Sequence, residues 1–358
     1  MRIRSVPTGR WLRWVLLAVF VVLAAAGCAE NYPQTTLAPK GDFARLVDDV
    51  FMTTVRWAIL VFVVVEGFLL YAIIKFRGKP DDPEPKQFHG STVLEIVWTA
   101  IPAVILVLIA VPTIRVIFET AKTPDDGALV VEVVGHQWWW EFRYPEYGIT
   151  TANEMHVPVG RTVDIRMISD DVLHSFWLPQ LAAKRDVFPK RETRIWFTAE
   201  VSGRYSGQCA EFCGIQHGRM GFQVVASDPA DFSAWVDAMA AATAPVAIAD
   251  STSQAAAGQQ LFLTKACVGC HSLNAAAPPA GLIGPNLANI GARTHIAAGM
   301  LENTDENLAR WIRDPQGFKE GSKMLNLGLT EAETEALVAY LRAQQVVNAG
   351  GALAARLD

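Results

Sequence analysis

The chain has 358 residues and a formal net charge of −5, a length that leaves room for two or three domains. The acidic balance, without a basic stripe, argues against nucleic-acid binding. Apolar residues make up 51% of the sequence, and their excess over a soluble protein is concentrated in the first 118 residues. The composition therefore indicates membrane-inserted segments at the N-terminal end of the chain.

Residues 1–27 predict a signal peptide. Four arginines lie in the first 13 residues, an apolar run follows from Trp14 to Ala26, and small residues lie directly before Cys28. This arrangement resembles a bacterial lipoprotein signal that is cleaved before an acylated, lipid-anchoring Cys28. The alternative is an uncleaved third helix, although the apolar core is short for a span of about 20 residues.

Residues 28–122 predict a transmembrane hairpin with helices at about 53–76 and 93–118, each long enough to cross about 30 Å of hydrocarbon. The connecting segment is short, proline-rich and basic, with four positive side chains in or beside it: Lys75, Arg77, Lys79 and Lys86. The positive-inside rule puts this segment in the cytoplasm. We therefore expect a multi-pass protein of a bacterial cell (inner) membrane, with all later domains on the outer, periplasmic side.

Two acids lie at membrane depth, where carboxylates are costly and often mark proton paths or protein contacts. Glu95 lies near the cytoplasmic end of the second helix, so snorkelling to the interface is an alternative to a proton path. For Glu66, packing against a partner helix is favoured over a relay. Neither helix contains a histidine, so haem iron and a catalytic copper within the membrane would need ligands from a partner subunit.

Residues 123–240 predict an all-β domain. Runs rich in β-branched and aromatic residues at 129–137, 161–167 and 193–199 are separated by turn residues, a pattern typical of a Greek-key sandwich or barrel.

A dense set of metal-binding side chains lies near the end of this β domain. An electron-transfer copper takes two imidazoles, one thiolate and a weak thioether, and this chain offers one thiolate more. Two thiolates four residues apart predict a bridge between two copper ions, with one backbone carbonyl as a further weak ligand. The predicted ligands are His174, Cys209, Glu211 (carbonyl), Cys213, His217 and Met220. The alternative, a Cys209–Cys213 disulfide, leaves both histidines and the methionine without a role.

Other notable side chains lie outside that loop. His136 and His156 are interpreted as hydrogen-bonded structural histidines. Trp138, Trp139 and Trp140 are consecutive. We expect two of the three in the core, while one exposed indole would form a surface through which electrons enter.

Four motifs resemble subunit II of the haem-copper cytochrome c oxidases, over about residues 43–226. They are Leu94-Glu95-Ile-Val-Trp98-Thr-Ala-Ile-Pro102, Gly135-His-Gln-Trp138, Asp171-Val-Leu-His174-Ser-Phe and the run Gly207–Met220. The resemblance implies a cupredoxin domain that holds the binuclear CuA centre on the six ligands given above. It also implies a magnesium ion shared with subunit I at the Glu211 side chain, electrons entering at Trp138, and a proton-channel mouth at Glu95.

The resemblance is broken at one turn. The family usually has Asp-x-x-Pro-Gly-Arg, whereas this chain has Asp186-Val-Phe-Pro189-Lys190-Arg191. A lysine at positive φ is uncommon, so the backbone of this turn is expected to be affected. Relatives that oxidise quinol lack the copper residues, and the presence of every ligand here favours an oxidase fed by a cytochrome.

Residues 255–348 resemble an all-α class I cytochrome c, joined through a flexible linker at 241–254. Helices are expected at 255–265, 303–313 and 331–345, the last with Leu337, Tyr340 and Leu341 on one face. Cys267 and Cys270 have the spacing for thioether bonds to haem c, and His271 is the expected iron ligand. A chance match or a thiol redox pair are the alternatives. Met324 is the favoured sixth ligand, and the competing Met300 is interpreted as a packing residue.

Together these features favour subunit II of a caa-type terminal oxidase, part of a proton-pumping cytochrome-c oxidase without itself holding the catalytic centre. The expected partners are subunit I with haem a, subunit III, membrane lipid, and a cytochrome c or cytochrome bc1-type donor. The linker would make haem-to-copper transfer a tethered encounter whose effective concentration depends on linker length. The alternatives are the corresponding subunit of a nitric oxide reductase and a copper chaperone.

Overall fold

The computed structural model describes residues 32–78, 87, 90–276 and 283–346, together with residues 11, 13, 15–20 and 22. Cys28 and most of the predicted signal peptide lie outside the described residues, as do Lys79 and Lys86. Residues 45–123 form one compact unit, and the rest of the described chain forms a second.

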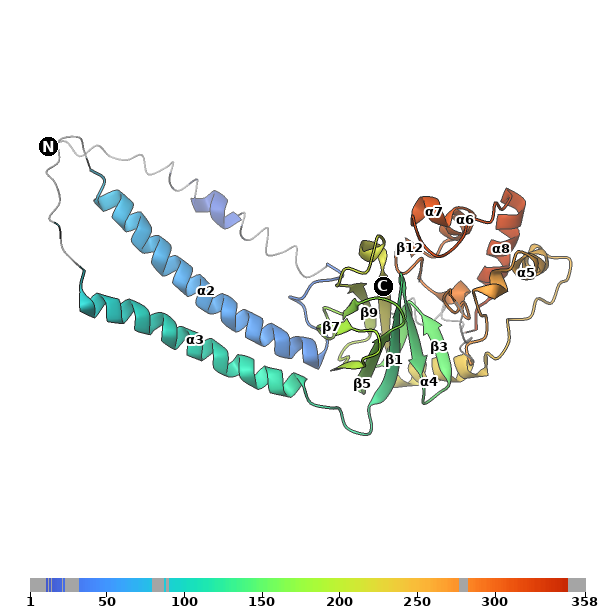
Figure 1. Ribbon diagram of the computed structural model, residues 1–358, viewed down its shortest axis with the longest axis horizontal. Coiled ribbons are helices and arrows are strands. Elements are labelled where there is room, and N and C mark those ends of the chain that lie inside the picture. The colour runs from blue at the N-terminus through green and yellow to red at the C-terminus, as the bar shows by residue number, and fades with distance from the viewer. Residues whose placement is uncertain are drawn as a thin grey trace. The chain divides into compact units, whose positions relative to one another are not determined.

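Two helices of the described chain are long and apolar enough to cross a membrane, α2 (Asp42–Lys75) and α3 (Thr92–Thr120). They run in opposite directions (Figure 1). Both predicted spans are confirmed as helices, but α2 begins about three turns earlier than residue 53. Hydropathy detects only the apolar part of α2, whereas its first turns mix acidic residues such as Asp48 and Asp49 with apolar ones and are amphipathic.

The first turn of α2 belongs to the second unit. Phe43 is only 3% exposed and packs edge-on against Trp196, with ring centroids 5.3 Å apart. The Asp42 carboxylate accepts a hydrogen bond from the Thr198 N–H at 2.7 Å, and Gly41 forms a β-bridge with Ala199. The start of the helix is thereby fixed to the edge strand of a β-sheet.

The β domain is a sandwich, which decides between the two predicted architectures. One sheet has the strand order β3-β2-β1-β5-β8 and the other has β4-β10-β9-β6-β7. Neighbouring strands pair mostly antiparallel, with β1/β5 and β4/β10 parallel. The strands are β1 (Leu129–His136), β2 (Trp139–Tyr144), β3 (Ile149–Ala152), β4 (Glu154–Pro158), β5 (Thr162–Ser169), β6 (His174–Trp177), β7 (Lys184–Val187), β8 (Thr193–Thr198), β9 (Gly203–Cys209) and β10 (Gly221–Ser227).

The sandwich core explains why these segments form strands. Alternate residues of β1 and β5, such as Val131, Val133, Ile165 and Met167, are fully buried between the sheets. The helix α4 (Pro229–Ala241) follows β10 and packs Trp235 against the buried Tyr144, with ring centroids 5.3 Å apart.

The C-terminal domain is helical, as predicted, with one short two-stranded ladder that the sequence did not suggest. Its elements are α5 (Gln254–Thr264), η2 (Cys267–Gly269), η3 (Ile290–Ala292), β11 (His295–Ile296), β12 (Leu301–Glu302), α6 (Asp305–Arg313), α7 (Pro315–Phe318) and α8 (Glu331–Ala343). Gly258 of α5 lies so close to α8 that a Cβ atom there would be 1.9 Å from the Ala336 carbonyl oxygen, so these helices cross at a glycine. The predicted apolar face of α8 is confirmed, because Leu337, Tyr340 and Leu341 are buried.

Candidate metal centre and haem site

Strand pairing brings the predicted copper ligands together. His174 is the first residue of β6, Cys209 is the last of β9, and these strands pair with Phe176 opposite Cys209. The chain then loops through Cys213 and the short helix η1 (His217–Arg219) before β10 begins. Residues 35 positions apart in sequence therefore share one end of the sandwich.

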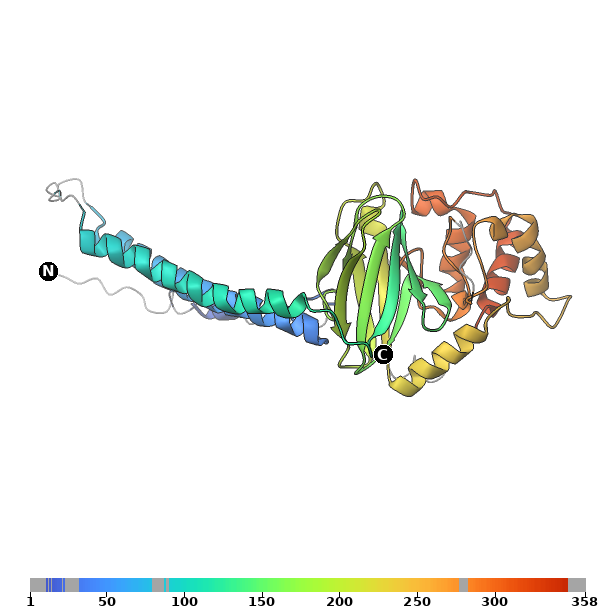
Figure 2. The same ribbon diagram turned by 60° about the horizontal axis from the view of Figure 1, so that its bottom comes forward.

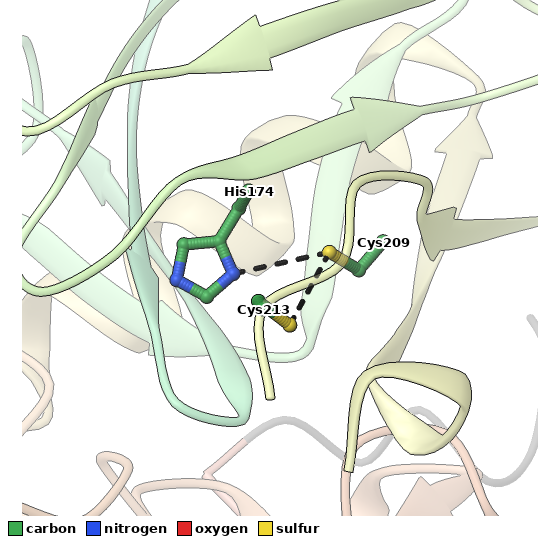
Figure 3. A group of neighbouring side chains, drawn as sticks. All are labelled: His174, Cys209 and Cys213. Carbon is green, nitrogen blue, oxygen red and sulfur yellow. Dashed lines mark hydrogen bonds between the residues drawn. The ribbon is translucent and has the colours of Figure 1, made fainter. Parts of the chain in front are cut away.

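The ligand atoms form a connected chain with equal spacings. His174 Nδ1 is 3.8 Å from Cys209 Sγ, and the two sulfur atoms are 3.8 Å apart (Figure 3). Cys213 Sγ is in turn 3.8 Å from both His217 Nδ1 and Met220 Sδ. Because a disulfide requires about 2.05 Å between the sulfur atoms, the alternative of a Cys209–Cys213 disulfide is wrong.

This cluster is shielded from water. His174, Cys209, Cys213 and Met220 are each at most 3% exposed, and His217 is half-buried. The carbonyl oxygen of Glu211 lies beside the thiols, 3.4 Å from Cys209 Sγ. Two buried thiols, two imidazole nitrogens, a thioether and a carbonyl are the donor set of a thiolate-bridged copper site, so the residues present fit copper.

The two cysteines interact strongly. Their mutual hydrogen bond lowers the pKa of Cys209 and raises the pKa of Cys213. Contacts with His174 and with backbone groups lower the pKa of Cys209 further. Metals bind thiolates, so metal binding at these cysteines would release protons.

A carboxylate orients the first imidazole. Asp171 Oδ1 lies 2.9 Å from His174 Nε2, which leaves Nδ1 directed at the sulfur atoms. Burial alone would raise the pKa of Asp171, but hydrogen bonds from His174 and from two backbone N–H groups, those of Gln137 and Val172, hold it well below its usual value. The sequence motif contained Asp171, but its role was not predicted. The signal was a carboxylate three residues before a ligand histidine.

Trp138 lies directly against the segment from Cys209 to Met220, here named the copper loop. Its indole Nε1–H donates to the Cys213 carbonyl at 3.0 Å, and the Gln137 amide donates to the same oxygen at 2.7 Å. Trp139 and Trp140 are buried, which confirms the expectation of two core tryptophans, whereas Trp138 is half-buried rather than exposed.

The histidines interpreted as structural are hydrogen-bonded, as expected. His136 Nε2 is 3.2 Å from a Glu141 carboxylate oxygen, and its ring stacks on Trp139. His156 Nε2 is 3.0 Å from a carboxylate oxygen of Glu154. Neither forms part of the copper cluster.

The haem motif has the geometry that a proximal ligand needs. His271 Nδ1 donates to the Pro285 carbonyl at 2.8 Å, which leaves Nε2 for iron, and burial lowers the pKa of His271. A Cβ atom on Gly284 would be 2.6 Å from the imidazole ring, so glycine is required there. Cys267 and Cys270 are free thiols. The residues present fit a covalently attached haem.

The methionines differ in surroundings. Met324 is half-buried, and its carbonyl accepts a hydrogen bond from Gln316 at 2.6 Å; the exposed Leu325 (70%) follows it. Met300 is 36% exposed rather than packed in the core, because it follows the positive-φ residues Ala298 and Gly299 in a surface turn.

The two acids of the membrane unit lie within its helices. Glu95 lies in the first turn of α3, and Glu66 lies within α2. Both helices are long and apolar enough to cross a membrane, and the roles of the two acids stay predictions.

Comparisons with known proteins cover all three parts of the chain. Family models match residues 34–116 (cytochrome c oxidase subunit II, transmembrane domain), 148–227 (cytochrome c oxidase subunit II, periplasmic domain) and 255–345 (cytochrome c). Cytochrome c oxidase subunit 2 of Alkalihalophilus pseudofirmus is 39% identical over 335 residues, which cover 92% of this chain and 96% of the relative. The chain belongs to the cytochrome c oxidase subunit II family.

Further similar proteins bear the same family name. Cytochrome c oxidase subunit 2 of Bacillus sp. strain PS3 is 36% identical over 354 residues, 93% of this chain and 98% of the relative. Among solved structures, the periplasmic domain of subunit II of cytochrome oxidase from Bradyrhizobium japonicum is 30% identical, covering 32% of this chain and 95% of that chain with a TM-score of 0.31. The three matching family models divide this oxidase subunit into a membrane hairpin, a cupredoxin-like sandwich and a fused cytochrome c domain.

Proposed function

We propose that this subunit II carries electrons from an external cytochrome c or cytochrome bc1-type donor through its haem c to a pair of copper ions, and on to haem a of subunit I. There dioxygen would be reduced to water with proton pumping. The observation that carries the proposal is the buried chain of donors from His174 through Cys209 and Cys213 to His217 and Met220, each step 3.8 Å.

The residues proposed to hold the copper pair are His174, Cys209, Glu211 (carbonyl), Cys213, His217 and Met220. Bound copper would supply a one-electron carrier whose charge is shared between two metals. The protein's part is to keep the thiols buried, to orient His174 through Asp171, and to exclude water from the sulfur atoms. Trp138, hydrogen-bonded to the Cys213 carbonyl, is the proposed residue through which electrons reach the copper pair.

For the haem, Cys267 and Cys270 are the proposed thioether residues, with His271 and Met324 as iron ligands. Bound haem c would supply the second one-electron carrier, and ligation by His and Met suits electron transfer by raising the potential. The hydrogen bond from His271 to Pro285 would hold the ligand imidazole in one orientation.

The remaining roles are proposed by family membership. Glu95 would form the mouth of a proton channel in subunit I, and the Glu211 side chain would bind a magnesium ion shared with that subunit. Cys28 would be the acylated N-terminus after cleavage of residues 1–27. The proposed location is the inner membrane of a bacterium, with the hairpin 28–122, the cupredoxin domain 123–240, the linker 241–254 and the cytochrome domain 255–348, assembled with subunits I and III.

The test replaces one copper ligand. His217→Ala in the intact oxidase should abolish oxygen uptake while haem c is still reduced by its donor, as followed by the haem absorbance. The control is His136→Gln, which removes an imidazole outside the copper loop and should keep turnover. If His217→Ala consumed oxygen at the parent rate, the serial route through copper would be wrong. A nitric oxide reductase subunit or a copper chaperone is not favoured by the family assignment.

A further inference from the structure

The contact between the cytochrome domain and the sandwich extends beyond the copper loop. Two hydrogen bonds join their backbones directly, from Thr150 N–H to the Ala275 carbonyl at 2.8 Å and from Gly221 N–H to the Ala298 carbonyl at 2.9 Å. Thr150 belongs to the edge strand β3, and Gly221 directly follows the proposed copper ligand Met220. Backbone pairing of this kind fixes the register of the two surfaces. Figure 2 shows the cytochrome helices, in orange and red, beside the sandwich.

A set of buried and half-buried polar residues, here named the polar seam, lies between the two domains. It consists of Thr151, Glu154 and Arg204 from the sandwich and Arg293 and Thr294 from the cytochrome domain. Glu154 accepts a hydrogen bond from the Thr294 hydroxyl at 3.3 Å, Arg204 donates to the same hydroxyl at 3.2 Å, and Arg293 donates to the Thr151 hydroxyl at 3.4 Å.

Two of the three charges of the polar seam, those of Glu154 and Arg293, are out of water. Glu154 and Arg293 are each 6% exposed. An unpaired buried charge is strongly unfavourable. Glu154 pairs with His156 of its own domain, and Arg293 donates to carbonyl oxygens of its own domain. The opposite domain adds the hydroxyls of Thr294 and Thr151 and excludes water from both charges. A domain that left and returned in each catalytic cycle would have to rehydrate and dehydrate them each time.

Small apolar residues complete the contact. Ala298 is 2% exposed and packs with Trp139 and Ala152 of the sandwich. Ala275 and Ala288 of the cytochrome domain belong to the buried core cluster of the sandwich itself. This close apposition of core residues is typical of a permanent domain interface rather than of a transient encounter.

The same interface reaches the copper loop. The Lys319 ammonium, 3% exposed, donates to the Trp138 carbonyl at 2.9 Å, and the Gln216 amide donates to the Glu320 carbonyl at 2.5 Å. Lys323, next to Met324, is 3.5 Å from the Asp171 carboxylate that orients His174. The segment that carries the proposed haem ligand therefore lies against the loop that carries the proposed copper ligands.

We infer that the cytochrome domain is held stationary on the sandwich by the polar seam and its flanking contacts, so that residues 242–253 connect two fixed bodies rather than tethering a mobile carrier. This differs from the sequence-based expectation of a linker-limited encounter. Its consequence for electron transfer rests on the proposed function, whereas the stationary interface itself does not.

The first test lengthens the connection. Twelve residues, 242–253, separate α4 from α5. Inserting about 36 Gly/Ser residues after Thr243 would quadruple this length, and the effective concentration of a mobile domain would fall about eightfold. For a stationary domain, the rate of haem-to-copper electron transfer after flash reduction of haem c in the intact oxidase should stay within about twofold of the parent rate. An eightfold fall would overturn the inference.

The second test does not depend on electron transfer. Amide hydrogen exchange of the full chain, measured by mass spectrometry, should show Thr150 and Gly221 exchanging at least about 100-fold more slowly than unstructured amides. Ala298→Arg should speed this exchange by wedging the interface, while Ala332→Arg on the exposed face of α8 should not. Fast exchange in the parent protein would overturn the inference. If no electron reached copper while both amides stayed protected, the proposed function would fail and the inference would stand.

Discussion

Asp171 shows how one side chain beyond the metal ligands determines the geometry of the site. Its two carboxylate oxygens have separate partners: one faces His174 Nε2 at 2.9 Å, and the other accepts the Gln137 N–H at 2.7 Å. The same residue thus fixes a ligand imidazole and the backbone that leads to Trp138. Partners of metal-bound histidines of this kind usually change metal affinity by about 10–100-fold when removed.

We predict that Asp171→Ala weakens copper binding by about 10–100-fold, because His174 loses the acceptor that directs Nδ1 toward the sulfur atoms. Asp171→Asn keeps an oxygen acceptor and should therefore lose much less copper affinity. The measurement is titration of the copper-loaded chain with a competing chelator, followed by the copper absorbance. Asp170→Ala, at the neighbouring position with a side chain 73% exposed, is the control. Equal losses at positions 170 and 171 would show that Asp171 has no special role.

The members of the copper cluster could be predicted from the sequence because cysteine, histidine and methionine at such short spacings rarely occur together except where a metal binds. The structure brings all of them together within one loop and one strand end. Lys319 and Glu154 were not predicted. Each is an ordinary charged residue whose importance comes from a contact with a residue more than 130 positions away, and local patterns carry no information about such contacts.

The turn between Phe188 and Arg191 illustrates what an element can tolerate. Lys190 has φ of 62°, the left-handed conformation that the usual family glycine would adopt without strain. The turn nevertheless forms, because Phe188 and Arg191 make a β-bridge and the Arg191 guanidinium lies 3.8 Å from the centre of the Phe188 ring. The backbone of the turn is therefore kept, and the cost is conformational strain at the exposed Lys190.

We predict that Lys190→Gly stabilises the sandwich by about 0.5–1 kcal/mol, since relief of the left-handed strain exceeds the entropy cost of glycine. Lys190→Ala removes the same side chain but keeps the strain, so it should give no gain. The measurement is the midpoint of thermal unfolding of the copper-loaded chain. A gain of equal size in both variants would mean that the lysine side chain, not its φ, is unfavourable.

Element boundaries were predictable where a pattern is strong and less so elsewhere. The strands β1, β5 and β8 and the helices α5, α6 and α8 lie within a few residues of their predicted ranges, because alternation and helical periodicity persist through them. The start of α2 at Asp42 was missed because the first turn packs on the sandwich through Phe43, an interaction that hydropathy does not register.

For the molecule as a whole, the buried carboxyl group of Glu154 in the polar seam makes the stability of the chain sensitive to pH. Burial alone would raise the pKa of Glu154, but the hydrogen bond from His156 and the charges of Arg204 and Arg293 lower it to about 2, from 4.5. A carboxyl group with a lowered pKa in the folded state contributes stability above its unfolded pKa. That contribution is lost as the pH falls through the folded value.

We predict that Glu154→Gln destabilises the chain by on the order of 3 kcal/mol at pH 6, and that the difference falls to less than half of this at about pH 3, within the window between the unfolded and folded pKa values. The measurement is the free energy of unfolding of both forms across this range. A difference that stayed constant with pH would indicate that Glu154 acts through packing alone.

The anchoring of Phe43 has a practical consequence for anyone preparing a soluble form of the exported half. A polypeptide from which residues 1–123 are removed would lack Phe43, whose ring packs against Trp196, and Asp42, which accepts a hydrogen bond from the Thr198 N–H. Emptying a buried phenylalanine site typically costs about 3–5 kcal/mol, a large share of the stability of a domain. Residues 40–44 should therefore be grafted back onto any such fragment, or supplied as a peptide.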